Sequence, residues 1–455
     1  MSAHSPEQID SSPEPLDGST EQLAMHPLRE SLYEEMHSRP FQVIPSPARI
    51  SHLSVLCNEQ QKLDQFRHLQ RLCDHFGTPV PQEDVPCYQG QFGDLQVRRE
   101  KHLEFVSFTF IWLNGGSRDP FAETGVTHLP AGWLDGIPGQ VVAAFHVSVE
   151  DARDKTEPSI PEVKSFFETM RLVGSQPSQG CAQVWTSFNM HSDDFGRFLI
   201  YNREMSDSQL GRLVQRLLEI ESYRLMTLLG LPLARSISPR LQQMDLQLAE
   251  LTEVLSGDIA ECDERQLLAR LTKLASQVEA YRAQSTFRFN ATNAYQDLVL
   301  SRLNDLREDE VSGHLTLQEF ITRRLVPAVR TCQAVADRLE DLSRRIDRVS
   351  DMLRTQVELS IQGQNQELLS SMDQRSKIQL MMQHTVEGLS VAAISYYTIG
   401  LMKIFLGVLY DQGLEIDKSL ALGISMPVII LGVALITRRI HSKFSKLADE
   451  SAKQE

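Results

Sequence analysis

Few residues in this sequence have the types and the spacing that chemistry requires. Glu34 and His37 lie three positions apart, so a helix would place a carboxylate and an imidazole on one face, as a carboxylate-bridged metal site needs. The spacing occurs as a single copy, which favours a surface pair or a histidine at a helix end. Gly115 and Gly116 follow a strong strand candidate and predict a turn, with an anion-binding nest as the alternative.

The common catalytic motifs are absent from the sequence. It contains no phosphate-binding GxxxxGKS or GxxxxGKT loop, no GxGxxG after a strand, no HExxH and no GxSxG. We therefore predict that the protein is not an enzyme and that it has no catalytic, cofactor-binding or metal-binding residues.

Polar side chains concentrated near residue 30 are predicted to have a structural role. We expect them to form hydrogen bonds or ion pairs that fix a first helix onto a sheet. They are His26, Arg29, Glu34, Glu35, His37 and Arg39.

The rest of the chain is organised around two apolar segments near its C-terminal end. Residues 388–410 contain Lys403 as their only charge, and residues 419–437 contain none. Each is close to the length of about 20 apolar residues that a helix needs to span a bilayer. Since only eight residues join them, we predict a transmembrane hairpin; a buried hairpin within a soluble domain is the alternative. The simplest interpretation of Lys403 is a lysine side chain that reaches toward the membrane interface.

Basic residues flank the two segments on the side of the chain termini. They are Arg375 and Lys377 before the first segment, and Arg438, Arg439, Lys443 and Lys446 after the second. Short segments rich in Lys and Arg stay on the cytoplasmic side. The sequence therefore predicts a membrane protein that spans the bilayer twice, with both termini in the cytoplasm and the lipid bilayer as a partner.

Composition excludes some partners. The chain has 455 residues and a net charge of −15, and all of this negative charge lies before Gly388, since the residues from Gly388 on contain seven Lys and Arg against six Asp and Glu. An acidic body lacks the basic surface that nucleic-acid binding needs, so we expect no nucleic-acid partner. The six cysteines show no paired spacing typical of a metal site and are predicted to be free thiols in a reducing compartment.

The sequence before the membrane segments predicts an α+β domain followed by long helices. Residues 1–24 are acidic and rich in Ser and Pro, and are predicted to be a disordered tail. Residues 25–205 are predicted to form a cytoplasmic α+β domain. Its expected strands cover 49–56, 94–112, 139–149 and 180–189, and its expected helices cover 60–77 and 161–172. Side chains that alternate along 94–112 suggest a sheet with one buried face.

Residues 206–387 are predicted to form a helical bundle and coiled-coil stalk. Ser206 and Gln209 indicate a capping box, and Ser238 with Pro239 indicates the start of a second helix. Apolar residues then recur at alternating spacings of three and four over 241–255, 267–281 and 335–353. The first two stretches predict an antiparallel helix pair.

Three further expectations concern the helices. We expect a separate helix over residues 287–310, a turn at 311–314, and a kink or break at Pro327. Residues 388–437 are the predicted hairpin. Residues 438–455 are predicted to be a basic and then mixed cytoplasmic tail.

Five segments carry a resemblance to a known family. They read HPLRESLYEEMHSRPF, GRLVQRLLEIESYRLMTLLGLPLAR, FRFNATNAYQDLV, LREDEVSGHLTLQEFITRRLVPAVRTC and QHTVEGLSVAAISYY. Through them, and over nearly everything from His26 to about Arg439, the chain resembles a bacterial family of uncharacterised membrane-anchored proteins defined by a domain of unknown function. The resemblance implies membrane attachment, which for a bacterial protein facing the cytoplasm means the bacterial inner membrane, and it brings no activity, cofactor or site residue with it.

A looser resemblance is architectural. An acidic cytoplasmic domain, a long helix and a C-terminal two-helix hairpin look like CorA-type magnesium channels. Those channels carry a Gly-Met-Asn motif between the two spans, where this chain reads DQGLEIDK, and the departure puts metal transport in doubt.

We therefore predict a non-enzymatic, membrane-anchored protein that faces the cytoplasm and binds a partner or itself, as a homo-oligomer. The alternative is a divalent-cation channel or transporter subunit of CorA-like architecture, which the acidic loop residues Asp411, Glu415 and Asp417 would favour.

Overall fold

A computed structural model describes residues 25–35, 40–83, 85–113, 117–153, 157–256, 264–411 and 418–451. The chain divides into two compact units. The first contains residues up to 257 together with 269–347, and the second contains 258–268 together with 348–455. The predicted tail at 1–24, the two glycines at 115 and 116, and the centre of the loop between the apolar segments lie outside the described residues.

Within the described part of the first unit, nine strands form a single mixed sheet in the order β2-β3-β4-β1-β5-β8-β7-β6-β9. Neighbouring strands are antiparallel except β5 and β8, which are parallel. The strands are β1 (Ala48–Leu56), β2 (Cys87–Phe92), β3 (Leu95–Lys101), β4 (Phe105–Trp112), β5 (Gln140–Asp151), β6 (Val173–Gln176), β7 (Ala182–Thr186), β8 (Gly196–Asn202) and β9 (Asp309–Glu310).

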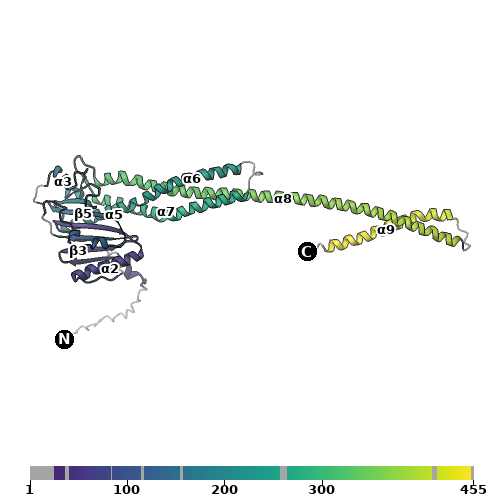
Figure 1. Cartoon of the computed structure of the whole chain (residues 1–455), viewed down its shortest axis with the longest axis horizontal. Helices are drawn as coiled ribbons and strands as arrows, with labels where there is room; N and C mark the ends of the chain where they lie inside the picture. Colours follow the sequence, from purple (N-terminus) through teal and green to yellow (C-terminus); the bar gives the residue numbers. More distant parts are fainter. Residues whose placement is uncertain are drawn as a thin grey trace, which may run out of the picture. The chain divides into compact units, whose positions relative to one another are not determined.

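Long helices make up most of the chain after β8 (Figure 1). The α-helices are α1 (Arg29–Glu35), α2 (Glu59–Phe76), α3 (Ile160–Phe166), α4 (Pro177–Gly180), α5 (Asp207–Leu228), α6 (Gly230–Ser256), α7 (Glu264–Leu306), α8 (Leu317–Asp411) and α9 (Lys418–Ser451). Two short 3-10 helices are η1 (Gly125–His128) and η2 (Leu134–Gly136). The chain thus has an N-terminal α/β sheet domain, a long helix and a C-terminal apolar helix.

Both faces of the sheet are buried, so the expected single buried face is wrong. On β4, Phe108 and Phe110 pack in a cluster with Leu69 and Leu72 of α2, and we call this side the α2 face. Ile111, on the opposite side of β4, packs in a cluster with α5, which defines the α5 face. Helices on both sides explain why seven of the eight β4 residues are buried.

The core of the α5 face includes helices from well beyond Ser206, where the sequence changes character. Leu210, Leu213 and Leu217 of α5 pack there with strand residues such as Ile50 and Phe145. The adjoining ends of α7 and α8 contribute to the same cluster. The predicted Ser206–Gln209 capping box is present at the start of α5 and satisfies two of its free N–H groups.

Helices α6, α7 and α8 lie side by side in the first unit (Figure 1). The predicted apolar residues of 241–255 and 335–346 are buried, as are those of 271–278. Ion pairs join the helices: Asp245 accepts from Arg338 at 2.7 Å and from Arg345 at 2.8 Å, and Arg282 donates to Glu340 at 2.8 Å. The apolar stripe of α8 over 335–346 is therefore covered by helices of the same chain.

The separate helix expected over 287–310 is wrong, because α7 continues without a break from Glu264 to Leu306. Ser285 and Thr286, just before the expected start of that helix, are already helical. Ser285 donates to the carbonyl oxygen of Tyr281 at 2.7 Å, and Thr286 donates to that of Arg282 at 2.7 Å. Such backward hydrogen bonds satisfy the hydroxyls without ending the helix. The turn expected at 311–314 is present and contains Gly313 at a φ of 78°.

Prolines lie inside two helices that the sequence predicted to start or break at them. Pro239 lies within α6, which already begins at Gly230, so the predicted start at Ser238 is wrong. The assigned helix α8 also runs through Pro327, so a break there is wrong. Each proline removes one N–H···O bond, and the packed faces of both helices compensate for that loss.

Four strands were not predicted from the sequence. They are β2, β6, β8 and β9, none longer than seven residues. Residues 94–112, which the sequence treated as one strand-like stretch, form the hairpin of β3 and β4. Helix α3 ends at Phe166, well before Leu172.

The second unit contains the first residues of α7, the remainder of α8 and all of α9. Both helices include stretches that are long and apolar enough to cross a membrane, one ending at Leu409 and one over Ser419–Ile440. Their apolar side chains are uncovered: Leu389 is 74% exposed, Leu401 is 68% exposed and Leu431 is 66% exposed. Burial inside a folded domain therefore does not account for the apolar character of these stretches.

Candidate functional site

The N-terminal residues singled out in the sequence make local contacts. Nδ1 of His26 accepts from the backbone N–H of Leu28 at 3.1 Å, and the guanidinium of Arg29 lies 5.6 Å from the ring centre of Tyr33. Leu28 and Tyr33 are exposed. The contacts described for His26 and Arg29 are local, and the expectation that these residues fix the first helix onto the sheet stays a prediction. The side chains of Glu34 and Glu35, and residues His37 and Arg39, lie outside what the structure describes.

The best-formed cavity of the described chain lies on the α5 face, between α5 and strands β1, β3 and β4. It encloses about 670 Å³ of empty space, including the part that is open to solvent, and about 80 Å³ is accessible to the centres of water-sized groups. Apolar residues form part of its wall, and polar side chains converge on it. Those used below are His52, Arg98, Glu100, Glu219, Ser222 and Tyr223.

His52 is a deeply buried polar part of the cavity wall. Its Nδ1 lies 2.8 Å from Oγ1 of Thr109, and its Nε2 lies 3.1 Å from Oγ of Ser222 and 3.3 Å from Oγ of Ser54. Burial lowers the pKa of His52 to about 3, and the nearby His102 and Arg98 lower it further in the same direction. The imidazole is thus neutral at pH 7 and held in place by three hydroxyl groups.

Arg98 lies at the side of the cavity and is almost fully buried. It donates to Glu100 at 2.7 Å and to the carbonyl oxygen of Pro40 at 2.6 Å. Its Nε has no hydrogen-bond partner among the described residues. Because Glu100 neutralises the guanidinium, the pair supplies directed polar groups without a net charge.

An extended segment, residues 40–45, passes over the N-terminal part of α5 and borders the cavity; we call it the strap. The N–H of Ile44 donates to the carbonyl oxygen of Asp207 at 3.2 Å, and Gln42 donates to Gln96 at 2.8 Å. Gln42 and Ile44 both line the cavity. The strap therefore connects the chain before β1 to the cavity wall.

The cavity has the features of a binding site for a small molecule, with a partly apolar wall and a few placed polar groups. Several of its ionisable side chains are paired or neutral: Arg98 forms an ion pair with Glu100, Glu219 forms one with Arg302, and His52 is neutral. Sequence reasoning missed it. The available signal was the polar run Ser51, His52 and Ser54 within a strand whose other residues are mostly apolar.

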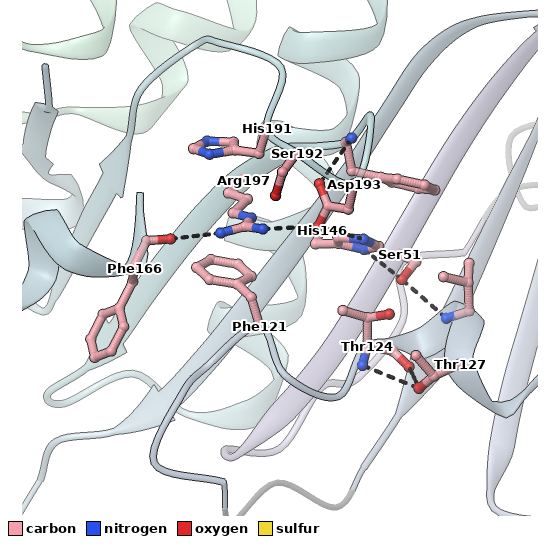
Figure 2. A network of polar contacts seen from close by, with 12 residues as sticks. Ser51, Phe121, Thr124, Thr127, His146, Phe166, His191, Ser192, Asp193 and Arg197 are labelled. Carbon is pink, nitrogen blue, oxygen red and sulfur yellow. Dashed lines mark hydrogen bonds and ion pairs between the residues drawn. The ribbon is translucent and has the colours of Figure 1, made fainter. Parts of the chain in front are cut away.

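A second polar network lies on the α2 face and contains a serine, a histidine and an aspartate (Figure 2). Oγ of Ser51 lies 2.8 Å from Nδ1 of His146, whose Nε2 lies 4.0 Å from Oδ2 of Asp193. The imidazole stacks on Phe195 at 4.1 Å. Burial lowers the pKa of His146 to about 4; Asp193 opposes this shift and Arg197 adds to it.

Arg197 connects this network to neighbouring loops (Figure 2). It donates to Asp193 at 2.9 Å and to the carbonyl oxygen of Phe166 at 2.8 Å, and it lies 5.1 Å from the ring centre of Phe121. Glu168 accepts from the hydroxyl of Ser192 at 2.6 Å. These contacts hold the loops after α3 and before β8 against the sheet.

The contacts from Ser51 to His146 to Asp193 resemble those of a hydrolase triad, but the surroundings of these three residues do not suit hydrolysis. Ser51 is fully buried and its Oγ also accepts from the N–H of Val126 at 3.2 Å. The empty space beside His146 is about 120 Å³. A nucleophile needs room for the substrate carbonyl and for an oxyanion, and neither fits here. The network is structural.

The remaining candidates from the sequence are Lys403, a metal site and the acidic residues of the loop. Lys403 lies in the apolar part of α8 and is exposed. Among the described residues, no group of three or more His, Cys, Asp or Glu side chains is arranged to hold a metal ion. Asp411, Glu415 and Asp417 of the loop fall at or beyond the edge of what the structure describes.

Comparison with known proteins places the chain in a family. The chain matches no curated protein and no solved structure at a significant level. Residues 24–444 match the model of a family described as protein of unknown function (DUF3422). This match covers nearly the whole sequence and includes the sheet, the bundle and both apolar stretches. The chain therefore belongs to the DUF3422 family.

Proposed function

We propose that the protein is anchored in the bacterial inner membrane by a helical hairpin, with spans at 388–410 and 419–437 and with both termini in the cytoplasm. The observation that carries this proposal is the exposure of apolar side chains along both stretches, such as Leu401 and Leu431. A bilayer removes such side chains from water, at about 25 cal/mol for each Å² of apolar surface. The basic residues near 375–377 and 438–446 support the cytoplasmic placement of both ends.

In this proposal the sheet domain is a binding module and not an enzyme. The polar cavity between α5 and the sheet supports this role, because Arg98 and Glu100 are paired there and the neutral His52 is positioned by hydrogen bonds. The Ser51, His146 and Asp193 network lacks space for a substrate and adds no catalytic centre. Anchoring would keep the module close to the membrane and allow several copies to associate.

Cysteine labelling in intact cells tests the topology. Gly413→Cys, in the loop, should react with an impermeant thiol reagent, whereas Ser451→Cys, near the C-terminus, should react only after the cells are opened. The unsubstituted chain is the control for its six native cysteines. Equal labelling of the two variants in intact cells would refute the hairpin.

Transport assays test the CorA-like interpretation on the same protein. Vesicles that contain the purified chain should show no more magnesium uptake than empty vesicles if the protein is an anchored binding module. Uptake that depends on the protein, and that falls when Glu415 and Asp417 are replaced by Asn or Gln, would favour the channel instead.

A further inference from the structure

The middle of α8 is a single helix without a covering neighbour. Every residue from 358 to 386 is exposed, within an unbroken helix. At 1.5 Å per residue this segment is about 44 Å long. Helix α8 has its buried apolar residues before this segment, at 335–353, and its apolar membrane candidate after it.

Six apolar side chains form a stripe along this part of α8. At 100° per residue, all six fall within an arc of about 80°. The stripe consists of Val357, Ile361, Leu368, Met372, Met382 and Val386. Val357 is half-buried, and exposure of the other five ranges from 51% at Ile361 to 65% at Met372 and Met382.

The opposite side of the same helix is mostly polar, with Leu359 and Met381 as its apolar members. Gln366 and Ser370 lie there, as does an ion pair in which Lys377 donates to Asp373 at 2.7 Å. The remaining apolar side chains of the segment are scattered around the helix. A helix with one apolar stripe and a polar back is typical of a surface that packs on another helix.

We infer that this stripe is the interface with a second copy of the chain, and that the two α8 helices lie parallel and in register. The stripe then faces itself, so that Ile361 meets Ile361 and Leu368 meets Leu368. The apolar residues over 335–346 are excluded from this role, since they are buried where ion pairs join α8 to α6 and α7 of the same chain. Self-association therefore uses a different part of α8 from the one that the sequence pattern indicated.

The extent of the stripe supports a second copy as its occupant. Complete burial of one such side chain removes about 100 Å² of apolar surface. Six on each of two copies remove roughly 1,200 Å², which is the lower end of the range for specific interfaces. The parallel direction rests on the proposed membrane anchor: two copies that enter the bilayer just after Val386 have the same direction and the same depth.

Single cysteines on the two sides of α8 test this inference in membranes that contain the full chain. The stripe variants are Ile361→Cys, Leu368→Cys and Met372→Cys, and the matched controls on the polar side are Gln366→Cys and Ser370→Cys. Mild oxidation should convert each stripe variant to a disulfide-linked dimer at least five times more completely than either control. The unsubstituted chain corrects for native cysteines.

Each other outcome contradicts the inference in a defined way. Dimers at only one stripe position indicate antiparallel helices, and equal yields on both sides, or no dimer at all, indicate that the stripe is not the interface. A linked product whose mass differs from twice that of the chain indicates a different partner. Extraction by alkaline carbonate distinguishes the membrane anchor from the dimer interface, because carbonate removes proteins that do not span the bilayer. If the protein is removed but still forms dimers at all three positions, the anchor is refuted and the interface is retained.

A charge placed on the stripe provides a second measurement. Leu368→Arg should shift the detergent-solubilised protein to half its mass in light scattering, while Ser370→Arg should not. An equal mass for both variants would overturn the inference.

Discussion

The carbonyl oxygen of Gln42 in the strap lies directly over Gly211 of α5. A β-carbon added at Gly211 would come 1.9 Å from that oxygen and 3.4 Å from the backbone nitrogen of Ile44. Glycine at this position therefore allows the strap to cross the helix in backbone contact, and the strap in turn closes one side of the cavity.

Gly211→Ala should displace the strap and destabilise the first unit. The clash involves backbone atoms, which cannot rotate away, and overpacking of this kind costs about 1–3 kcal/mol. Greater helix propensity of alanine offsets up to about 1 kcal/mol of this. Urea unfolding followed by tryptophan fluorescence measures the change, since Trp112, Trp133 and Trp185 all lie in the sheet domain.

Gly363→Ala is the matched control for this substitution. Gly363 is also helical, and an added β-carbon there meets no atom within 4 Å. Its substitution should leave the tryptophan transition unchanged. A Gly211→Ala protein as stable as the Gly363→Ala protein would show that the strap does not depend on the close approach.

The ion pair between Glu104 and Arg288 should be worth more than an exposed pair. Glu104 follows β3 and is buried, and Arg288 of α7 donates to it at 3.0 Å through one of its nitrogens. Replacement of either residue by Gln should cost about 1.5–3 kcal/mol, because the partner charge is left buried and unpaired. The double variant should lose less than the sum of the single losses.

The exposed pair of Arg270 and Glu250, at 2.9 Å, is the control for that cycle. Coupling between two side chains that are about half exposed should be about 0.2–1 kcal/mol. Equal coupling energies for the two pairs would contradict the expected role of burial.

Two buried histidines should make the stability fall in mild acid. The pKa of His146 is lowered to about 4 and that of His52 to about 3, from 6.5 in the unfolded chain. A lowered histidine pKa means that the unfolded chain binds more protons, so stability is present above pH 6.5 and is lost as the pH falls toward 4. Each histidine contributes a slope of at most about 1.4 kcal/mol per pH unit in this range.

His146→Gln should make the free energy of unfolding fall less steeply with decreasing pH, because one of the two histidines no longer takes up a proton on unfolding. Urea unfolding at pH 7.0, 6.0 and 5.0 gives the slope for the variant and for the unsubstituted protein. The stability of the variant at pH 7 should also be lower, since the contact with Ser51 changes. An unchanged slope would mean that His146 is protonated equally in both states.

A chain that ends before Val386 should be soluble without detergent. The sheet domain and the three-helix bundle bury their apolar residues within the first unit, so they do not need lipid for this purpose. Circular dichroism and the tryptophan transition should match those of the full chain. Aggregation of this shorter chain in all buffers would contradict the proposed division between folded module and anchor.

The long periodic stretches of this sequence were predictable, and the reasons are local. The residues over 241–255 and 335–346 have the spacing of one helical face, and a helix that buries this face satisfies local and tertiary preferences together. The capping box at Ser206 was predictable because it depends only on residues three positions apart. Such signals need no knowledge of distant partners.

The missed features depend on residues that are far apart in the sequence. The two residues of β9 are charged and have no strand propensity; they are extended because β6 pairs with them. The cavity likewise combines His52, Arg98 and Glu219, from two strands and a helix. Prolines at 239 and 327 were misread since packing along a long helix outweighs the loss of one hydrogen bond.

The pairing of β6 with β9 determines the order in which this protein is completed during synthesis. Ser175 pairs with Glu310, and the core of the α5 face requires residues of α8 as far as Val329. Contacts between residues so distant in the sequence form slowly and only after both partners have left the ribosome. The N-terminal sheet therefore stays incomplete while α5, α6 and α7 are translated. It can close before the apolar residues from 388 onward are made, so the module is able to fold ahead of the segment that we propose enters the membrane.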